Sequence, residues 1–224
     1  MVPVYKVLEE VLDRLMNKYM ARVPAASGII EEMIKAGLIN SGNEIENDHI
    51  AFRTLGVPHL GIGSLEKIFL HYGYSKRDYY FFPEKKLDAY WYAPADSGNP
   101  RIFISELRVN DLSADTRRII QSYTDEVTAD PVDSLNLDDA DAVDTFLHSG
   151  LWRLPTWQDY SALAAESEYA AWAIYNRYYL NHFTISVHNL PDGYNTVARF
   201  NDFLESNGFL LNDASGKIKA SPDG

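Results

Sequence analysis

An internal repeat limits the possible folds of this 224-residue chain more than any other feature of its sequence. The first copy begins near His49 and has the pattern of a strand, a helix and three further strands. The second begins near His182 and has the pattern of a strand, a helix and two short extended runs, over residues 209–212 and 217–220. One copy cannot easily bury its own sheet face, so two copies side by side are expected to form a curved sheet with a central cavity.

Local signals at matching places support the repeat. Each copy opens with Asp or Asn, then His, then an apolar residue. Each helix is expected to end at a glycine that precedes an aromatic residue, namely Gly73 and Gly208. The first of these helices is expected to begin with Ser64 as its N-cap.

Helices are predicted before the repeat, over residues of about 3–20 and 25–37. Between the copies, the stretch from Ser113 to about Tyr179 contains helix caps and alanines and aromatic residues at helical spacing, which indicates a helical insertion. We therefore expect one domain over residues 1–224. Its expected parts are N-terminal helices (1–40), a first module (45–110), the insertion (111–180) and an incomplete second module (181–224).

The composition excludes several kinds of site and partner. Cysteine is absent, so a metal would need nitrogen and oxygen ligands, and a cysteine nucleophile is excluded. The net charge of −12 should repel nucleic acid and anionic membranes, so neither is expected as a partner. The sequence has neither an apolar run of roughly 18–20 residues nor a secretory signal pattern. We expect a cytoplasmic location, and the oligomeric state stays open.

The opening strands carry the candidate site residues. Alternate residues of a strand share a face, which places His49 with Arg53 on one side of the first strand. His182 lies at the matching point of the second strand. A polar, His-bearing face suits a wet cavity, although it could also simply face bulk solvent. The pairing favours the cavity and predicts that His49 and His182 bind one metal.

The remaining histidines have weaker signals. They lie in loops, at helix ends or at the end of a strand, and we expect structural roles for all of them: His59, His71, His148 and His188.

Three segments resemble the 2-oxoadipate dioxygenase/decarboxylase family, whose members are also called hydroxyglutarate synthases. They are Asp48–Thr54, Phe103–Leu107 and Asn181–Val187, and the terminal Lys219–Gly224 also fits. The resemblance covers most of the chain from about residue 45. The family is similar in fold to the vicinal oxygen chelate superfamily. It implies an α+β fold in which two βαβββ-type modules form a curved mixed sheet around a metal cavity, with N-terminal helices and a helical insertion.

The resemblance implies a catalytic domain and a non-haem iron enzyme. In such an enzyme His49 and His182 would be ligands of Fe(II), and Arg53 would contact the substrate. These three residues would be the catalytic ones. The implied reaction uses O2 to convert a 2-oxo dicarboxylic acid, 2-oxoadipate, into 2-hydroxyglutarate and CO2. Two imidazoles and one carboxylate leave open positions on iron for the 2-oxo acid and O2.

The third metal ligand is not evident in the sequence. The resemblance implies a Glu on the last strand of the second module. The spacing from His49 to Glu106, applied to His182, leads beyond Gly224. We therefore expect either that the chain is a fragment with an incomplete site, or that Glu106 serves as an internal ligand. Alternatively, Glu106 has a structural role and forms an ion pair with Arg101 or Arg108.

Two other functions stay open. The same pocket could serve a metal-dependent hydrolase or isomerase, which oxygen consumption and dependence on Fe(II) would distinguish. A non-catalytic binding protein with an incomplete metal site is the second alternative, and a missing third carboxylate would favour it.

Overall fold

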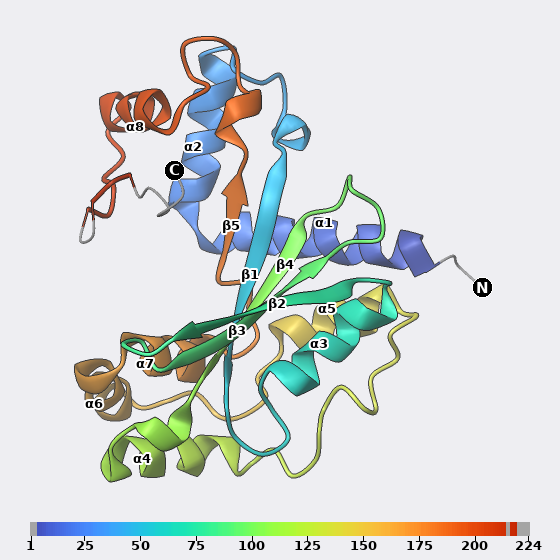
Figure 1. Cartoon of the computed structure of the whole chain (residues 1–224), viewed down its shortest axis with the longest axis vertical. Coiled ribbons are helices and arrows are strands. Elements are labelled where there is room, and N and C mark those ends of the chain that lie inside the picture. Colours follow the sequence, from blue (N-terminus) through green and yellow to red (C-terminus); the bar gives the residue numbers. More distant parts are fainter. Residues whose placement is uncertain (1–3, 214–215, 219–224) are drawn as a thin grey trace. The chain divides into compact units, whose positions relative to one another are not determined.

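The computed structural model of the chain describes residues 4–213 and 216–218 and contains a five-stranded mixed sheet (Figure 1). The strand order is β2-β3-β4-β1-β5. The described residues divide into two compact units. The first unit comprises the N-terminal residues through Leu15 together with His49–Phe183. The second comprises Met16–Asp48 and the segment from Thr184 onward. Whether the chain acts as one catalytic domain stays a prediction.

The first copy of the repeat folds as predicted, as a strand, a helix and three strands. These elements are β1 (Asn47–Leu55), α3 (Ile62–His71), β2 (Ser75–Phe82), β3 (Leu87–Ala93) and β4 (Arg101–Leu107). Strand β1 pairs with β4 in parallel, whereas β2, β3 and β4 pair in antiparallel fashion. The sheet is therefore mixed, and the α+β class is confirmed.

Helix α3 covers one face of this sheet. The Phe52 ring of β1 lies 5.4 Å from the Phe69 ring of α3, and Ile50, Ile102 and Ile104 are fully buried. Because side chains alternate along a strand, Arg53 points to the opposite face. The register pairs it with Ser105 of β4, which faces the same way.

Strand β2 forms an edge of the sheet, and all eight of its residues are exposed. The Tyr80 and Phe82 rings stack on each other, and Tyr80 also contacts Phe103. The pairing of β2 with β3 shifts register between Lys76 and Tyr79.

The predicted helical insertion lies between β4 and β5 (His182–Ile185). It consists of α4 (Ala114–Thr124), α5 (Ala140–His148), α6 (Trp157–Glu166) and α7 (Glu168–Asn176). Side-chain oxygens cap all four helices, from Ser113, Asp139, Thr156 and Ser167. The Ser167 cap starts α7 only two residues after α6 ends.

The second unit has its own apolar core. Helices α2 (Pro24–Lys35) and α8 (Val197–Ser206) and the loop after α2 supply the buried residues Met33, Leu38, Ile39, Phe200, Phe203 and Leu204. Helix α1 (Val4–Arg22) contributes residues to both units.

The second copy of the repeat departs from the prediction after its first strand. Strand β5 ends at Ile185 and a 3-10 turn, Val187–Asn189, follows, so His188 lies in this turn and not at the end of the strand. Residues 209–213 form no strand, and neither do Lys217 and Ile218. The other residues of the predicted last strand, and the terminal Lys219–Gly224, lie outside the described residues.

The N-cap of α3 differs from the predicted one. Ser64 lies buried inside the helix, and Gly61 is the N-cap, at a φ of 87°. In place of a serine, the Glu106 carboxylate accepts a hydrogen bond of 2.7 Å from the Ile62 N–H at the helix start. A negative group at this end is also favoured by the helix dipole. A Cβ on Gly61 would lie 2.2 Å from Glu106 Oε2.

Tyr169 joins α7 to the junction of β1 and β4. The buried Thr54 N–H donates to the Tyr169 hydroxyl oxygen (3.1 Å), and the hydroxyl donates to the Ser105 carbonyl (2.9 Å). The Ser105 hydroxyl donates to the Phe52 carbonyl in the adjacent strand (3.2 Å). Burial raises the pKa of Tyr169, so the phenol stays protonated at neutral pH.

Within residues 4–213 and 216–218, each helix is too short or too polar to cross a membrane.

We predict that Gly61→Ala destabilises the fold, because Ala disfavours this positive φ and its Cβ would collide with Glu106. The expected loss is more than about 2 kcal/mol in urea unfolding. The matched control is Gly63→Ala in the same helix, where nothing lies within 4 Å of the new Cβ. That variant should gain about 0.5–1 kcal/mol, because Ala favours helix over Gly. Equal stability of the two variants would contradict the role of Gly61.

We predict that Tyr169→Phe lowers the free energy of unfolding by about 1–3 kcal/mol, because the buried Thr54 N–H loses its acceptor. Tyr175→Phe provides the control on the same helix, since Tyr175 is 49% exposed. The control should stay within about 0.5 kcal/mol of the parent protein. Thermal or urea unfolding of both variants measures the difference, and an equally small change in both would refute the role of the Tyr169 hydroxyl.

Candidate active site

The structure brings together the two histidines that the repeat pairs. The His49 and His182 ring centroids lie 5.8 Å apart, with an angle of 77° between the ring planes. They meet because β1 and β5 are neighbours in the sheet, where the Asn181 N–H donates to the Ala51 carbonyl (2.9 Å). Two imidazoles at about 2.1 Å from one metal, with about 90–110° between them, would have centroids roughly 4.5–5.3 Å apart. The observed spacing is about 0.5 Å wider than this range.

His182 has a defined tautomer and charge. Its Nδ1 lies 2.7 Å from the Asn181 side-chain oxygen, which can only accept, so Nδ1 carries the hydrogen and Nε2 keeps its lone pair. The pKa of His182 is lowered to about 4, although the residue is partly open to solvent. The largest cause is the packing of other atoms around its ring, and the nearby His49 and Arg53 make smaller contributions. At neutral pH the ring is therefore uncharged, which is the form that ligates metal.

Arg53 lies between aromatic rings and one carboxylate. Its guanidinium carbon is 4.8 Å from the Tyr169 ring centroid and 5.1 Å from that of Trp172. Its Nη1 lies 3.3 and 3.4 Å from the two carboxylate oxygens of Glu168. The Arg53 side chain is 22% exposed, whereas that of Glu168 is 74% exposed. The aromatic rings therefore hold the guanidinium, and the carboxylate is its solvent-facing partner.

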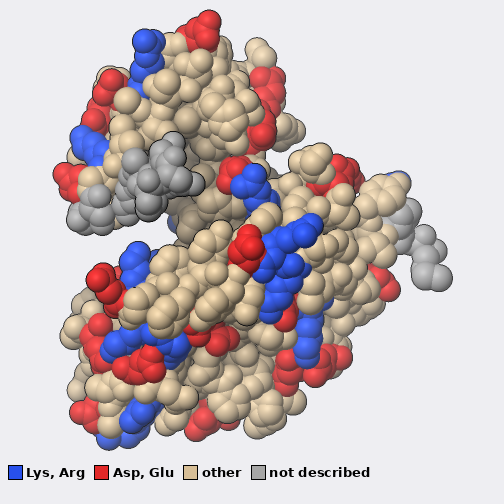
Figure 2. All heavy atoms as spheres, viewed as in Figure 1, with Lys and Arg blue, Asp and Glu red and all other residues tan. Residues whose placement is uncertain are grey.

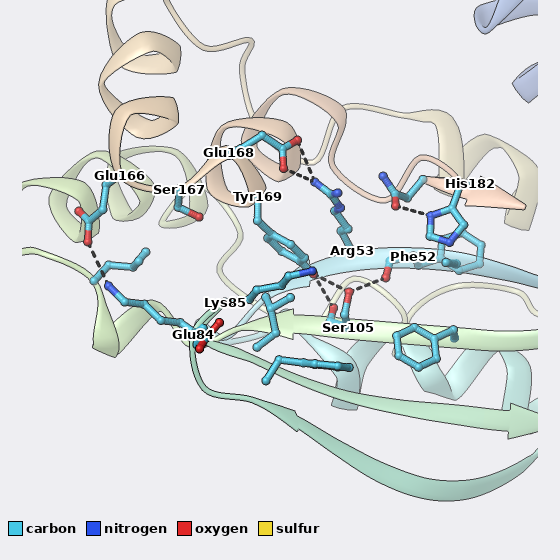
Figure 3. A pocket seen from close by; sticks show the side chains of 17 residues that line it. Phe52, Arg53, Glu84, Lys85, Ser105, Glu166, Ser167, Glu168, Tyr169 and His182 are labelled. Atoms are coloured by element: carbon cyan, nitrogen blue, oxygen red, sulfur yellow. Dashed lines mark hydrogen bonds and ion pairs between the residues drawn. The ribbon is translucent and has the colours of Figure 1, made fainter. Parts of the chain in front are cut away.

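Arg53 and His182 line one cavity of about 480 Å³ (Figure 3). Its floor is the sheet face with Ala51, Phe103 and Ser105, and its walls come from the α6–α7 junction and the turn between β2 and β3. The volume is within the roughly 300–1,000 Å³ typical of small-molecule sites.

Charged side chains of both signs line this cavity. The basic ones are Arg53, Lys85 and Lys86, and the acidic ones are Glu84, Glu166 and Glu168. Figure 2 shows that acidic and basic groups are also intermixed over the viewed surface, even though the chain carries a net charge of −12. The cavity lining is thus balanced in charge, unlike the chain as a whole.

Glu166 is held by structural contacts. It accepts hydrogen bonds from the Ser113 N–H (2.9 Å) and the Ser113 hydroxyl (2.6 Å), and it pairs with Lys86 at 3.4 Å. The hydrogen bonds from Ser113 and Thr116 lower the pKa of Glu166 to about 2. The Glu166 carboxylate therefore joins the end of α6 to the start of α4 and to the turn between β2 and β3.

Glu106 does not serve as a third ligand for the histidine pair. The register pairs it with Thr54, and it lies on the α3 side of the sheet, where it caps α3. Burial raises its pKa. Arg108, one of the two arginines considered as partners of Glu106, pairs instead with Asp88 (3.4 Å) and Asp111 (2.6 Å). In the part of the chain that the structure describes, no group of three His, Asp or Glu residues is arranged to hold a metal.

The other histidines lie where structural roles are expected. His71 contacts Asp138 at 2.8 Å, and the Nδ1 of His148 lies 2.8 Å from the Asp144 carbonyl. His188 belongs to the 3-10 turn after β5. His59 has a φ of 65° in the loop before α3.

Several residues that contact Arg53 have no signal in the sequence that would assign them to a site. Glu168, Tyr169 and Trp172 belong to a helix rich in alanine and aromatic residues, and they reach Arg53 across more than a hundred positions. Asn181 did have a signal, because it precedes His182 as Asp48 precedes His49. That signal marked the repeat but did not indicate that Asn181 orients the imidazole.

Known proteins are similar to this chain in sequence and fold. Residues 11–224 match the 2-oxoadipate dioxygenase/decarboxylase family. The chain is 38% identical to the chloroplastic 2-oxoadipate dioxygenase/decarboxylase of Arabidopsis thaliana and 39% identical to the chloroplastic/amyloplastic one of Oryza sativa subsp. japonica. Both matches cover 96% of this chain but 58% of the relative, so the chain spans less than two thirds of their length.

A solved structure agrees with these matches. The crystal structure of hydroxyglutarate synthase from Oryza sativa in complex with 2-oxoadipate superposes with a TM-score of 0.86 at 36% sequence identity. The match covers 100% of this chain and 72% of that one. The family match, the sequence identity and the shared fold together show that the chain belongs to the 2-oxoadipate dioxygenase/decarboxylase family.

Proposed function

We propose that this protein carries out the iron-dependent oxidative decarboxylation and hydroxylation of a 2-oxo dicarboxylic acid, converting 2-oxoadipate into 2-hydroxyglutarate and CO2. The observation that carries the proposal is the position of His182, which lies beside His49 and lines the same cavity as Arg53. The cavity thus places one candidate metal ligand, His182 with His49 beside it, near a cation for a carboxylate. Family membership and the 2-oxoadipate bound in the Oryza sativa structure support the choice of substrate.

The donor set suits a ferrous ion. His182 presents the lone pair of Nε2 because Asn181 occupies its Nδ1, and the His49 ring lies beside it. We propose that a carboxylate outside the described residues completes the site. When bound, Fe(II) supplies the one-electron chemistry that activates O2.

The residues of the chain bind and orient the substrate. Arg53 would hold the distal carboxylate, since a guanidinium can grip a carboxylate through two parallel hydrogen bonds. Tyr169 and Trp172 restrict the plane of the guanidinium and so fix its direction. Because the Tyr169 hydroxyl is protonated and donates to Ser105, it adds no negative charge beside the dianionic substrate.

The products account for both atoms of O2. One oxygen atom enters the carboxylate of the shortened acid as CO2 leaves, and the other becomes the new hydroxyl group. A hydrolase or isomerase using this cavity would consume no O2, so oxygen uptake separates the alternatives.

The expected cytoplasmic location stays a prediction.

We predict that His49→Ala and His182→Ala each abolish stoichiometric iron binding, because each removes one nitrogen donor from the pair. Iron content is measured after anaerobic loading of the protein produced from its full coding sequence. His71→Ala is the matched control, since His71 pairs with Asp138 on another element. Full iron content in both site variants would refute the metal assignment.

We predict that Arg53→Ala raises the KM for 2-oxoadipate by about 10- to 100-fold, because a bidentate charged contact in a partly buried site is worth roughly 1.5–3 kcal/mol. Iron content should not change. Arg53→Lys should recover only part of the loss, since an ammonium cannot reproduce the planar fork. Arg77→Ala, on the exposed edge strand, controls for the loss of one positive charge. An unchanged KM in Arg53→Ala would remove Arg53 from the substrate site.

A further inference from the structure

We infer that Glu168 is an internal competitor for Arg53, which the distal carboxylate of the substrate must displace. This inference rests on the proposed function, in which Arg53 binds that carboxylate. In the absence of substrate, Glu168 neutralises the guanidinium that would otherwise face the cavity alone. The exchange of one carboxylate for another would then set how tightly the cavity holds both the substrate and the product, since each has a distal carboxylate.

The Arg53–Glu168 contact has the geometry of a weak pair. Both Glu168 oxygens lie more than 3 Å from the same nitrogen, at 3.3 and 3.4 Å, whereas strong charge-assisted hydrogen bonds are about 2.7–2.9 Å. The Glu168 side chain is 74% exposed, so little packing holds it in place. Exposed ion pairs of this kind contribute only about 0.2–1 kcal/mol.

The two partners are held unequally. Arg53 lies against Tyr169 and Trp172 and is 22% exposed, so its guanidinium can remain in position while its partner changes. Glu168 is the first residue of α7, and rotation of its side chain would carry the carboxylate into solvent without moving the helix. The backbone start of α7 stays fixed because the Ser167 hydroxyl accepts from the Ala170 N–H (3.1 Å).

The other acidic groups of the cavity cannot take this role. Glu166 is held by Ser113 and Lys86, as its low pKa of about 2 reflects. Glu84 lines the cavity from the turn between β2 and β3, whereas the carboxylate that pairs with Arg53 belongs to Glu168. Of these carboxylates, Glu168 is therefore the one that lies beside Arg53, where the distal carboxylate of the substrate would bind.

The balance of charges in the cavity favours the exchange. The cavity lining carries three basic and three acidic side chains, so its side chains alone have no surplus positive charge to offer the distal carboxylate. If Glu168 stayed in place, the distal carboxylate would meet a like charge at Arg53. Release of Glu168 into water removes this repulsion at the cost of a weak, exposed pair.

The test is ligand binding by calorimetry under argon, with the protein produced from its full coding sequence. Glu168→Gln should bind 2-oxoadipate and the product 2-hydroxyglutarate about two- to five-fold more tightly than the parent protein, the range that an exposed ion pair provides. It should bind 2-oxohexanoate, which lacks the distal carboxylate, no more tightly. Glu84→Gln removes the same charge from the same cavity and should change the affinity for 2-oxoadipate less than Glu168→Gln does.

A double-mutant cycle isolates the exchange. In an Arg53→Ala background, Glu168→Gln should no longer tighten binding of 2-oxoadipate, because there is no cation left to compete for. Weaker binding by Glu168→Gln would show instead that Glu168 positions Arg53, and equal gains in Glu84→Gln would show a general charge effect; either result overturns the inference. A parent protein that does not bind 2-oxoadipate, or binds it independently of Arg53, would instead defeat the proposed function.

Discussion

The parallel pairing of β1 with β4 is the interaction on which the candidate site depends. Its register aligns Arg53 with Ser105 and Thr54 with Glu106, so each residue pair shares one face of the sheet. A slip of one residue in either strand would exchange the faces. Arg53 would then enter the apolar layer beneath α3, or Glu106 would enter the cavity. The burial of Phe52 and Ile104 under α3 specifies the register and thereby specifies which charges reach the cavity.

The insertion between β4 and β5 gives this cavity its second wall. Its last helix supplies the aromatic rings beside Arg53, and the Tyr169 hydroxyl joins that helix to the strands through Thr54 and Ser105. The hydrogen bonds therefore link the position of α7 to the same strand pair that presents Arg53. A helix added between two copies of a repeat can in this way become part of the site without altering the strand order.

Strand periodicity and the repeat were enough to predict the central features. Alternation placed His49 and Arg53 on one face, and the matching motif at His182 predicted that the two histidines meet. These inferences succeed because a strand fixes side-chain direction locally, within a few residues.

Long-range contacts could not be predicted in the same way. Serine is a residue type that favours N-cap positions, which is why Ser64 was predicted to cap α3. The group that caps α3 is instead the Glu106 carboxylate, which comes from a distant strand. The partner of Arg53 likewise comes from a helix whose sequence shows only alanine and aromatic spacing. The strands expected after α8 did not form in the described residues, because a weak extended pattern specifies a strand only when a neighbouring strand pairs with it.

The exposed edge strand β2 has a consequence for how the protein behaves at high concentration. Its unpaired backbone groups and its run of aromatic side chains, Tyr79–Phe82, form a template on which another chain could add a strand. The charged Lys76, Arg77 and Asp78, together with the register shift beside them, interrupt that template at one end. Resistance to aggregation should therefore depend on these few charges more than on the free energy of unfolding, so that a neutral substitution there could leave the fold intact and yet promote self-association.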